Sequence, residues 1–345
     1  MPDTLHLDAS LPADIARAAE LLQQGRLVAF ATETVYGLGA NALSPTAVAA
    51  IFAAKQRPAW DPLIVHIASL AQLPSVATIP PVFASRISHL ASAFWPGPLT
   101  LLLPRSATIP DAVTAGRELV AVRIPSHPAA QALLKAAGLP IAAPSANLFG
   151  HTSPTTAAHV LADLNGRIDA VLDAGPTTVG VESTVLDPTQ TPMVLYRPGA
   201  VAAGQLSVET GVAVRVFEPI TTELPEAMPS PGVGLRHYAP RARLMLIDPT
   251  VEEDMEHSLL RQSEIETQAG HRVGLMLPDG WAMLPGTYSF SWGSWHELEV
   301  LARNLFAGLR SLDERGVEVI LCPLPPTGGL ADALRDRLQK AARPA

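Results

Sequence analysis

The sequence is poor in cysteine, the residue that forms disulfide bonds and that binds zinc in many small folds. It has one cysteine, Cys322, which excludes an internal disulfide framework and a thiolate zinc cluster. No apolar run reaches the roughly 18 to 20 residues that a membrane span needs, and the first ten residues, MPDTLHLDAS, lack the basic start of a secretory signal. Charged residues make up 16% and hydrophobic residues 48%, so a large buried core is expected rather than disorder. We expect a cytoplasmic protein that does not associate with membranes.

A basic surplus is also missing. Residues 1–200 hold 11 Lys and Arg against 13 Asp and Glu, and the rest of the chain holds 13 against 19. Proteins that grip nucleic acid by its phosphates carry the opposite balance. Strong direct binding of nucleic acid is therefore not expected, although a local basic pocket is compatible with these numbers. Only three residues are lysines, Lys55, Lys135 and Lys340, so a lysine inside a motif is informative.

The common nucleotide and catalytic motifs are absent from the sequence. There is no GxxxxGK[ST] phosphate loop, no complete dinucleotide fingerprint, and no HExxH, GxSxG or Cys/His cluster. A nucleotide, if this chain binds one, must be held by a less common arrangement.

Residues 1–200 alternate between strand-length apolar runs and helical patterns. The strands are expected at 27–31, 63–68, 99–103, 119–124, 168–172, 184–187 and 193–196. The helices are expected at 13–24, 45–56, 82–94, 128–137 and 155–164. Some strands follow one another without a helix, so the pattern predicts a mixed, twisted α/β sheet.

The pattern weakens after Gly199. Residues 219–240 contain five prolines without periodicity, which is typical of a linker. A second α/β segment follows, with strands at 244–247, 273–277 and 317–322 and helices at 251–268, 295–314 and 330–342. We predict a catalytic domain at 1–212, a linker or lid at 213–240, and a smaller, mostly parallel, Rossmann-like domain at 241–345.

Polar and charged residues gather where the predicted strands end. Lys55 and Arg57 close a helix, and offsetting the helix dipole is enough to explain them. His66 lies in an apolar strand, where a structural histidine is the simpler interpretation. Arg123 interrupts the apolar strand LVAVRI, so it needs a partner, which is either a substrate anion or a structural carboxylate. Ends of strands in α/β sheets are also where ligands bind, and three cations with several hydroxyls at such junctions favour a ligand site.

The motifs as a set resemble the YrdC-like family. They read, in order, TETVYGLG, KQRP, PLIVHI, WPGPLT, AVRIPSHP, APSAN, SPT, GVEST and RPG. The later SPGVGLRHYAP and the ending GGLADALRDRLQKAA are similar to the two-domain threonylcarbamoyl-AMP synthases, so the resemblance covers nearly the whole chain.

This resemblance implies a reaction and a set of site residues. The family joins L-threonine, bicarbonate and ATP into threonylcarbamoyl-AMP and pyrophosphate, with magnesium and no tightly bound organic cofactor, and passes the product to a tRNA-modifying transferase complex. The residues matching its ATP and catalytic positions are Lys55, Arg57, Thr114, Ser145, Asn147, Ser153, Arg197, His237 and Tyr238. Those matching its threonine site are Thr32, His66, Arg123, Ala143 and Ser183. Metal ligands are not assigned. Arg123 is expected to hold the threonine carboxylate in a two-pronged bond, which lysine cannot reproduce.

The linker and three departures from the family pattern carry further expectations. Arg236, His237 and Tyr238 would form a lid that keeps water from the labile anhydride, or else pack the domains. Ala31 stands where proline is usual, Asp61 where asparagine is common, and 233–234 where methionine and a basic residue are usual. The last two changes bear on the affinity for ATP and for the lid.

Three other functions stay open at this point. One is a carbamoyl-adenylate former like those in hydrogenase-maturation proteins, which carry cysteine-rich segments that this chain lacks. The second is an RNA-binding module, against which the acidity and the lack of an aromatic and basic surface argue. The third is a protein that senses an amino acid or a nucleotide without turnover.

Overall fold

The computed structural model describes residues 3–218, 228–231, 237–248 and 254–343. Internal contacts divide the chain into two compact units. The first comprises Met1–Phe149, Ser153–Thr178 and Glu182–Gly234, and the second comprises Gly150–Thr152, Val179–Val181 and Leu235–Ala345. Among the described residues, no helix has both the length and the apolar character needed to cross a bilayer.

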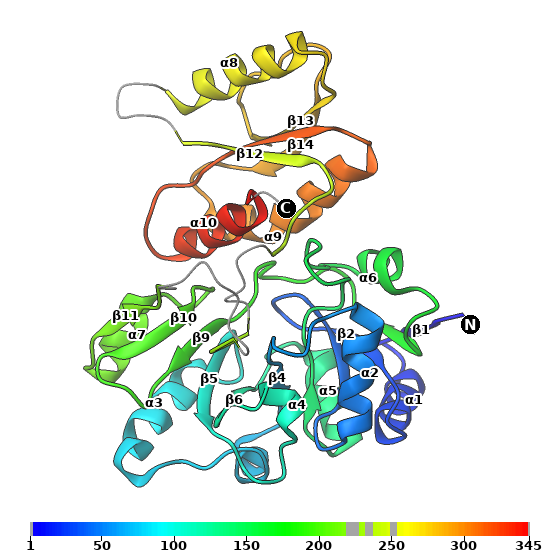
Figure 1. The fold of residues 1–345 in the computed structure, drawn as a ribbon, viewed down its shortest axis with the longest axis vertical. Coiled ribbons are helices and arrows are strands. Elements are labelled where there is room, and N and C mark those ends of the chain that lie inside the picture. Colours follow the sequence, from blue (N-terminus) through cyan, green and yellow to red (C-terminus); the bar gives the residue numbers. More distant parts are fainter. Residues whose placement is uncertain (1–2, 219–227, 232–236, 249–253, 344–345) are drawn as a thin grey trace. The chain divides into compact units, whose positions relative to one another are not determined.

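The first unit is built on one mixed sheet of eleven described strands (Figure 1). Their order is β1-β8-β2-β3-β7-β4-β6-β5-β9-β10-β11, with both parallel and antiparallel neighbours. The strand bounds are β1 Leu5–Asp8, β2 Val28–Ala31, β3 Tyr36–Asn41, β4 Ile64–His66, β5 Leu99–Pro104, β6 Leu119–Arg123, β7 Ile141–Ala142, β8 Ala170–Asp173, β9 Thr184–Asp187, β10 Met193–Arg197 and β11 Val214–Val216.

Helices cover this sheet unevenly. The helix bounds are α1 Pro12–Gln23, α2 Pro45–Lys55, η1 Leu70–Ser75, η2 Pro81–Phe83, α3 Ala84–Phe94, α4 Asp111–Thr114, α5 Pro128–Ala137, α6 Ala157–Leu164 and α7 Ala203–Thr210. Alternate strand residues point to opposite faces. On one face Val65, Leu101 and Val122 pack in the main core with α2, α3 and α6. On the other face Val28 and Phe30 pack against α1 and α5, which contact each other.

This second face changes character beyond β7. There the buried cluster is Ile64, Leu102, Ala121 and Val185, and all four are strand residues. The period of two puts His66, Arg123 and Thr100 on the same face, because each lies two residues from a cluster member on its own strand. A polar patch on a sheet face that the strands alone form is where this fold can hold a ligand.

The second unit contains a four-stranded sheet in the order β12-β15-β13-β14, in which every described pairing is parallel. Its elements are β12 Arg243–Ile247, α8 Met255–Gln268, β13 Val273–Pro278, β14 Tyr288–Gly293, α9 Leu298–Glu314, β15 Val319–Pro323 and α10 Leu330–Ala341. Its core includes Leu259 of α8 and Leu275, Val319 and Leu321 of the sheet. The predicted small, mostly parallel α/β domain is confirmed.

Several boundaries differ from the sequence prediction. Residues 36–41 were not assigned to a strand but form β3, and β1, β11, β14, α4 and α7 were not predicted either. Val214–Val216 was assigned to the linker, yet it pairs with β10 as the last strand of the first sheet. Residues 237–240, which the sequence prediction placed in the linker, belong to the second unit together with Gly150–Thr152 and Val179–Val181. The linker positions 219–227 and 232–236, including Arg236 and the 233–234 departure, lie outside the described residues.

Candidate functional site

The five residues predicted for threonine lie along the second face of the first sheet or in the loops that continue it. His66 ends β4 and is paired in register with Arg123, the last residue of β6. Ala143 follows β7, and its amide donates to the carbonyl of Ile64 (2.9 Å). Thr32 and Ser183 lie in the loops after β2 and before β9. All five are buried, with exposures of 4% or less.

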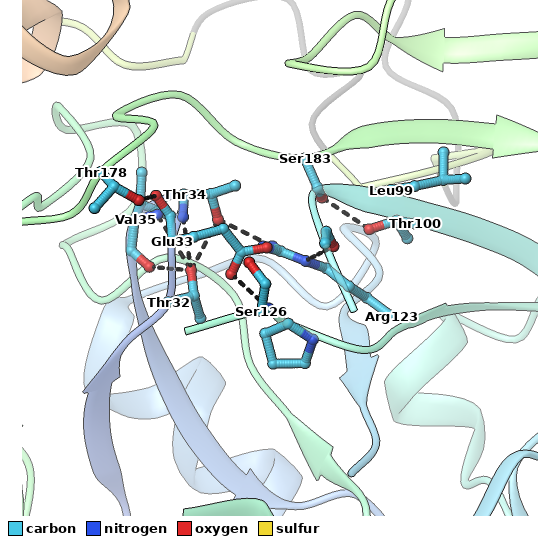
Figure 2. A network of polar contacts seen from close by, with 12 residues as sticks. Thr32, Glu33, Thr34, Val35, Leu99, Thr100, Arg123, Ser126, Thr178 and Ser183 are labelled. Carbon is cyan, nitrogen blue, oxygen red and sulfur yellow. Dashed lines mark hydrogen bonds and ion pairs between the residues drawn. The ribbon is translucent and has the colours of Figure 1, made fainter. Parts of the chain in front are cut away.

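Arg123 is the centre of this face, and Figure 2 shows its guanidinium directed toward the loop after β2. Its Nη2 forms an ion pair with Oε1 of Glu33 at 2.5 Å. Its Nη1 donates to Oγ1 of Thr34 (2.9 Å), and its Nε donates to the carbonyl of Gly97 (3.1 Å). The structural carboxylate that the sequence left open as a partner of Arg123 is therefore present.

The contacts of Arg123 do not occupy all the hydrogen-bond donors of its guanidinium. A guanidinium has five N–H groups, and the contacts above involve three of them, so one N–H on each Nη keeps donor capacity. A two-pronged carboxylate bond at Arg123 therefore stays a prediction that this geometry allows. Burial acts to raise the pKa of Glu33, but the charge and hydrogen bond of Arg123 outweigh it and lower that pKa. Glu33 is held as a carboxylate, and its Oε2 also accepts the amide of Ser126 (3.1 Å).

His66 is kept neutral in this environment. Burial, and then the positive charge of Arg123, lowers the pKa of His66 to about 3. Its ring meets Phe30 edge to face, with centroids 6.2 Å apart. Its Nδ1 has no hydrogen-bond partner among the described residues. A buried neutral imidazole with an unused nitrogen can hydrogen-bond a ligand without adding charge.

Hydroxyl groups flank Arg123 on both sides (Figure 2). Thr32 Oγ1 lies 2.8 Å from Thr34 Oγ1 and donates to the carbonyl of Val35 (2.7 Å). Thr100 Oγ1 lies 2.8 Å from Ser183 Oγ. The Nη2 of Arg197 donates to the same Ser183 hydroxyl (3.1 Å), and its Nε donates to the Ser183 carbonyl (3.0 Å). Arg197, a residue predicted for ATP, therefore contacts Ser183, a residue predicted for threonine.

Lys55, the last residue of α2, is buried with 1% exposure. Its Nζ donates to the carbonyl of Ser145 (2.6 Å) and to the carbonyl of Asn147. The loop after β7 therefore contacts Lys55 through its backbone carbonyls. The predicted role of the Ser145 and Asn147 side chains in binding phosphate stays a prediction. Burial, and then the like charge of Arg57, holds the pKa of Lys55 well below its usual value. A polyphosphate beside this group would favour its charged form.

Arg57 is held by the turn that leads into β4. Its Nη2 pairs with Oδ2 of Asp61 at 2.9 Å and donates to the carbonyl of Pro62 (2.9 Å), while its Nε donates to the carbonyl of Asp61 (3.2 Å). Both side chains are buried, at 5% and 4% exposure. Asp61, the residue noted above as a departure from the family pattern, is therefore the ion-pair partner of Arg57, which is predicted to bind the triphosphate.

Thr114 ends α4 close to the same turn, because the amide of Leu63 donates to the carbonyl of Val113 (2.8 Å). Its buried Oγ1 has no partner among the described residues. Thr114 lines a cavity of about 10 Å³ with Pro62, Pro229 and Pro231, which has room for roughly one water. Residues 228–231 thus cover this part of the face, and the amide of Met228 donates to the carbonyl of Trp60 (2.9 Å).

The remaining residues predicted for ATP lie in two places. Ser153 of the first unit donates through Oγ to Oε1 of Glu182 (2.5 Å). His237 and Tyr238 belong to the second unit. There Tyr238 is 1% exposed and stacks on Phe306, with ring centroids 5.7 Å apart. The guanidinium carbon of Arg337 lies 5.2 Å from the centroid of the tyrosine ring. These contacts all lie within the second unit, so the lid and the packing of the domains both stay predictions.

Sequence reasoning missed several partners of the predicted residues. Glu33 and Thr34 follow the predicted Thr32 in the motif TETVYGLG, Thr100 ends WPGPLT, and Glu182 lies in GVEST. The available signal was Glu33, the only carboxylate in TETVYGLG, beside a strand arginine that needs a counter-charge. Asp61 was noted as a departure but not as the partner of Arg57.

The fold and the site define an α/β protein that gathers buried cations, hydroxyls and a neutral histidine on one face of a mixed sheet. Residues 20–199 match the family described as telomere recombination (Sua5, YciO and YrdC), and residues 205–343 match the threonylcarbamoyl-AMP synthase C-terminal domain. The chain belongs to the Sua5/YciO/YrdC family.

Relatives match nearly the full length. The threonylcarbamoyl-AMP synthase of Pyrococcus abyssi is 42% identical over 94% of this chain and 93% of its own. That of Bacillus subtilis is 43% identical, over 95% and 92%. The crystal structure of P. abyssi Sua5 complexed with L-threonine superposes with a TM-score of 0.90 at 40% identity, covering 98% of this chain and 97% of that one.

Proposed function

We propose that this chain is an L-threonylcarbamoyladenylate synthase, which converts L-threonine, bicarbonate and ATP into threonylcarbamoyl-AMP and pyrophosphate. The observation that carries the proposal is the gathering of Thr32, His66, Arg123, Ala143 and Ser183 along one sheet face, in a chain similar over its length to a relative solved with L-threonine. The product serves the threonylcarbamoyl modification of adenosine in tRNA through a separate transferase complex, in the cytoplasm.

The chemistry joins two anions, so orientation and neutralisation of charge supply most of the rate. The threonine amine takes up bicarbonate as a carbamate, with loss of water. A carbamate oxygen then attacks the α-phosphorus of ATP, and the bond to the bridging oxygen breaks to release pyrophosphate. No covalent bond to the enzyme is needed at any step.

The threonine end of the site matches this chemistry. The two Nη groups of Arg123 can take the carboxylate while Glu33 and Thr34 fix the plane of the guanidinium. His66 offers a neutral nitrogen, and the Thr32 and Ser183 hydroxyls offer further polar contacts. Ala143 closes the pocket with a small side chain. In this arrangement Glu33 is a positioning residue for Arg123.

At the other end, Lys55, Arg57 and Arg197 supply positive charge for the triphosphate. Ser145, Asn147, Thr114 and Ser153 add polar groups, and His237 and Tyr238 are the candidates for a lid. Magnesium bound with ATP would shield the phosphate charges. The described residues contain no group of three or more His, Cys, Asp and Glu side chains that could hold a metal ion, so a magnesium ion here would depend on the phosphates and one or two protein oxygens, as is usual for MgATP.

The deciding experiment measures pyrophosphate release from purified protein with MgATP, with and without L-threonine and bicarbonate. We expect release that requires both, with threonylcarbamoyl-AMP identified by mass. Release without threonine would point to another acceptor, and ATP binding without release would point to a sensor. An Arg123→Lys variant is expected to need far more threonine, and an unchanged threonine KM would refute the carboxylate role.

A further inference from the structure

Asp61 is a buried carboxylate with only one of its two oxygens accounted for. Oδ2 forms the ion pair with Arg57 at 2.9 Å. Oδ1 is buried and has no hydrogen-bond partner among the described residues. An unsatisfied buried carboxylate oxygen costs free energy, commonly about 1–3 kcal/mol or more, and native folds rarely keep one without a reason.

The surroundings of Asp61 make it more unusual. Burial raises the pKa of Asp61, and the positive charges of Arg57, Lys55 and Arg197 act in the opposite direction. These three cations are the ones that the proposed function assigns to the triphosphate of ATP. A carboxylate among them repels phosphate, so its presence weakens nucleotide binding unless a further cation arrives with the nucleotide.

The choice of aspartate rather than its amide at position 61 is informative. An asparagine at this position would offer the same oxygen without the charge. Mg²⁺ prefers carboxylate oxygens, and with nucleotides it is usually held by one or two carboxylates together with the phosphates. An orphaned carboxylate oxygen amid phosphate-binding cations has the donor chemistry that such an ion requires.

We propose that Asp61 is the protein ligand through which this chain holds the magnesium ion of MgATP, with Oδ1 supplying the oxygen while Arg57 fixes Oδ2. The inference rests on the proposed function for its nucleotide. Nucleotide binding would then depend on Mg²⁺ for two reasons. Asp61 would bind the ion directly, and the ion would offset the repulsion between Asp61 and the phosphates.

The test compares the affinity for a nonhydrolysable ATP analogue by calorimetry in excess Mg²⁺ and in EDTA, for the full chain and for Asp61→Asn. Asparagine has nearly the same size and shape as aspartate, so the variant should fold. We expect the ratio of the two affinities to fall at least tenfold in Asp61→Asn, with metal-free binding equal or tighter. The matched control is Asp163→Asn, which removes another carboxylate that acts electrostatically on Lys55; it should leave the ratio unchanged.

A second readout does not depend on nucleotide affinity. Mn²⁺ is titrated into the protein saturated with the analogue and followed by electron paramagnetic resonance. Weaker Mn²⁺ binding in Asp61→Asn supports the inference. An equal change of affinity with and without metal, or unchanged Mn²⁺ binding, would overturn it and leave Asp61 as a counter-charge to Arg57. Metal-dependent nucleotide binding through Asp61 without threonine-dependent pyrophosphate release would support the ligand and refute the proposed function.

Discussion

Glu33→Gln removes the only carboxylate paired with the buried guanidinium of Arg123 in the described structure. The two groups meet at 2.5 Å, with 3% of the Arg123 side chain and 6% of the Glu33 side chain exposed. Breaking one partner of a buried ion pair leaves an uncompensated charge and costs about 3–5 kcal/mol. Arg123 would keep its bonds to Thr34 and Gly97, so we expect the lower part of this range. For a domain of this size that lowers Tm by roughly 6–12 °C.

The assay is a double-mutant cycle in chemical denaturation with Glu33→Gln, Arg123→Met and both changes together. We expect the double variant to be less destabilised than the sum of the single variants by about 2 kcal/mol or more, because it buries no lone charge. The pKa of Glu33 is lowered in the folded state, so its contribution is present above its ordinary pKa and is lost as the pH falls through the lowered value. Glu33→Gln should remove that acid dependence. Additivity of the single changes within about 0.5 kcal/mol would refute the ion-pair reasoning.

Three further predictions follow from buried groups. The pKa of His66 is lowered to about 3, so the unfolded chain binds a proton below pH 6.5 that the folded chain does not; His66→Gln should remove about 2 kcal/mol of stability loss between pH 8 and pH 5, measured by urea unfolding at both values. Gly180 has φ +83° and a Cβ there would lie 2.4 Å from the carbonyl oxygen of Ala302, so Gly180→Ala should destabilise the second unit by more than the roughly 1 kcal/mol of an unfavourable φ. The control is Gly270→Ala, with φ +87° and open space, and equal calorimetric shifts in the two variants would contradict the steric argument. Lys55→Met keeps the stem but removes the donor to two carbonyls, of which that of Asn147 is buried and that of Ser145 partly buried. We expect a loss of at least tenfold in ATP affinity with a stability cost of about 1–3 kcal/mol. Calorimetric titration with unchanged ATP affinity would show that Lys55 only holds the loop after β7 in place.

The failure to predict β3 shows where local pattern stops being informative. Gly37 and Gly39 interrupt the alternation of Tyr36–Asn41, and glycine argues against a strand. The structure gives the reason for Gly39, because a Cβ there would lie 2.9 Å from both Ile141 and Phe30. Close packing between the strands requires a residue without a side chain at position 39. The contact with Ile141 joins segments about a hundred residues apart, so no local window contains it.

The sequence by itself determined the class of fold, the small parallel domain and the types of residue at the site, because periodicity and composition are local. It also identified the family, since ordered motifs carry that information. Only the tertiary structure decided the partners: Glu33 for Arg123, Ser183 for Arg197, and Asp61 for Arg57 with one carboxylate oxygen left over. Even Arg57 and Asp61, four residues apart, needed the turn before β4 to bring them together out of water. Pairing is set by which strands become neighbours and which faces lose contact with solvent, and both are properties of the folded chain.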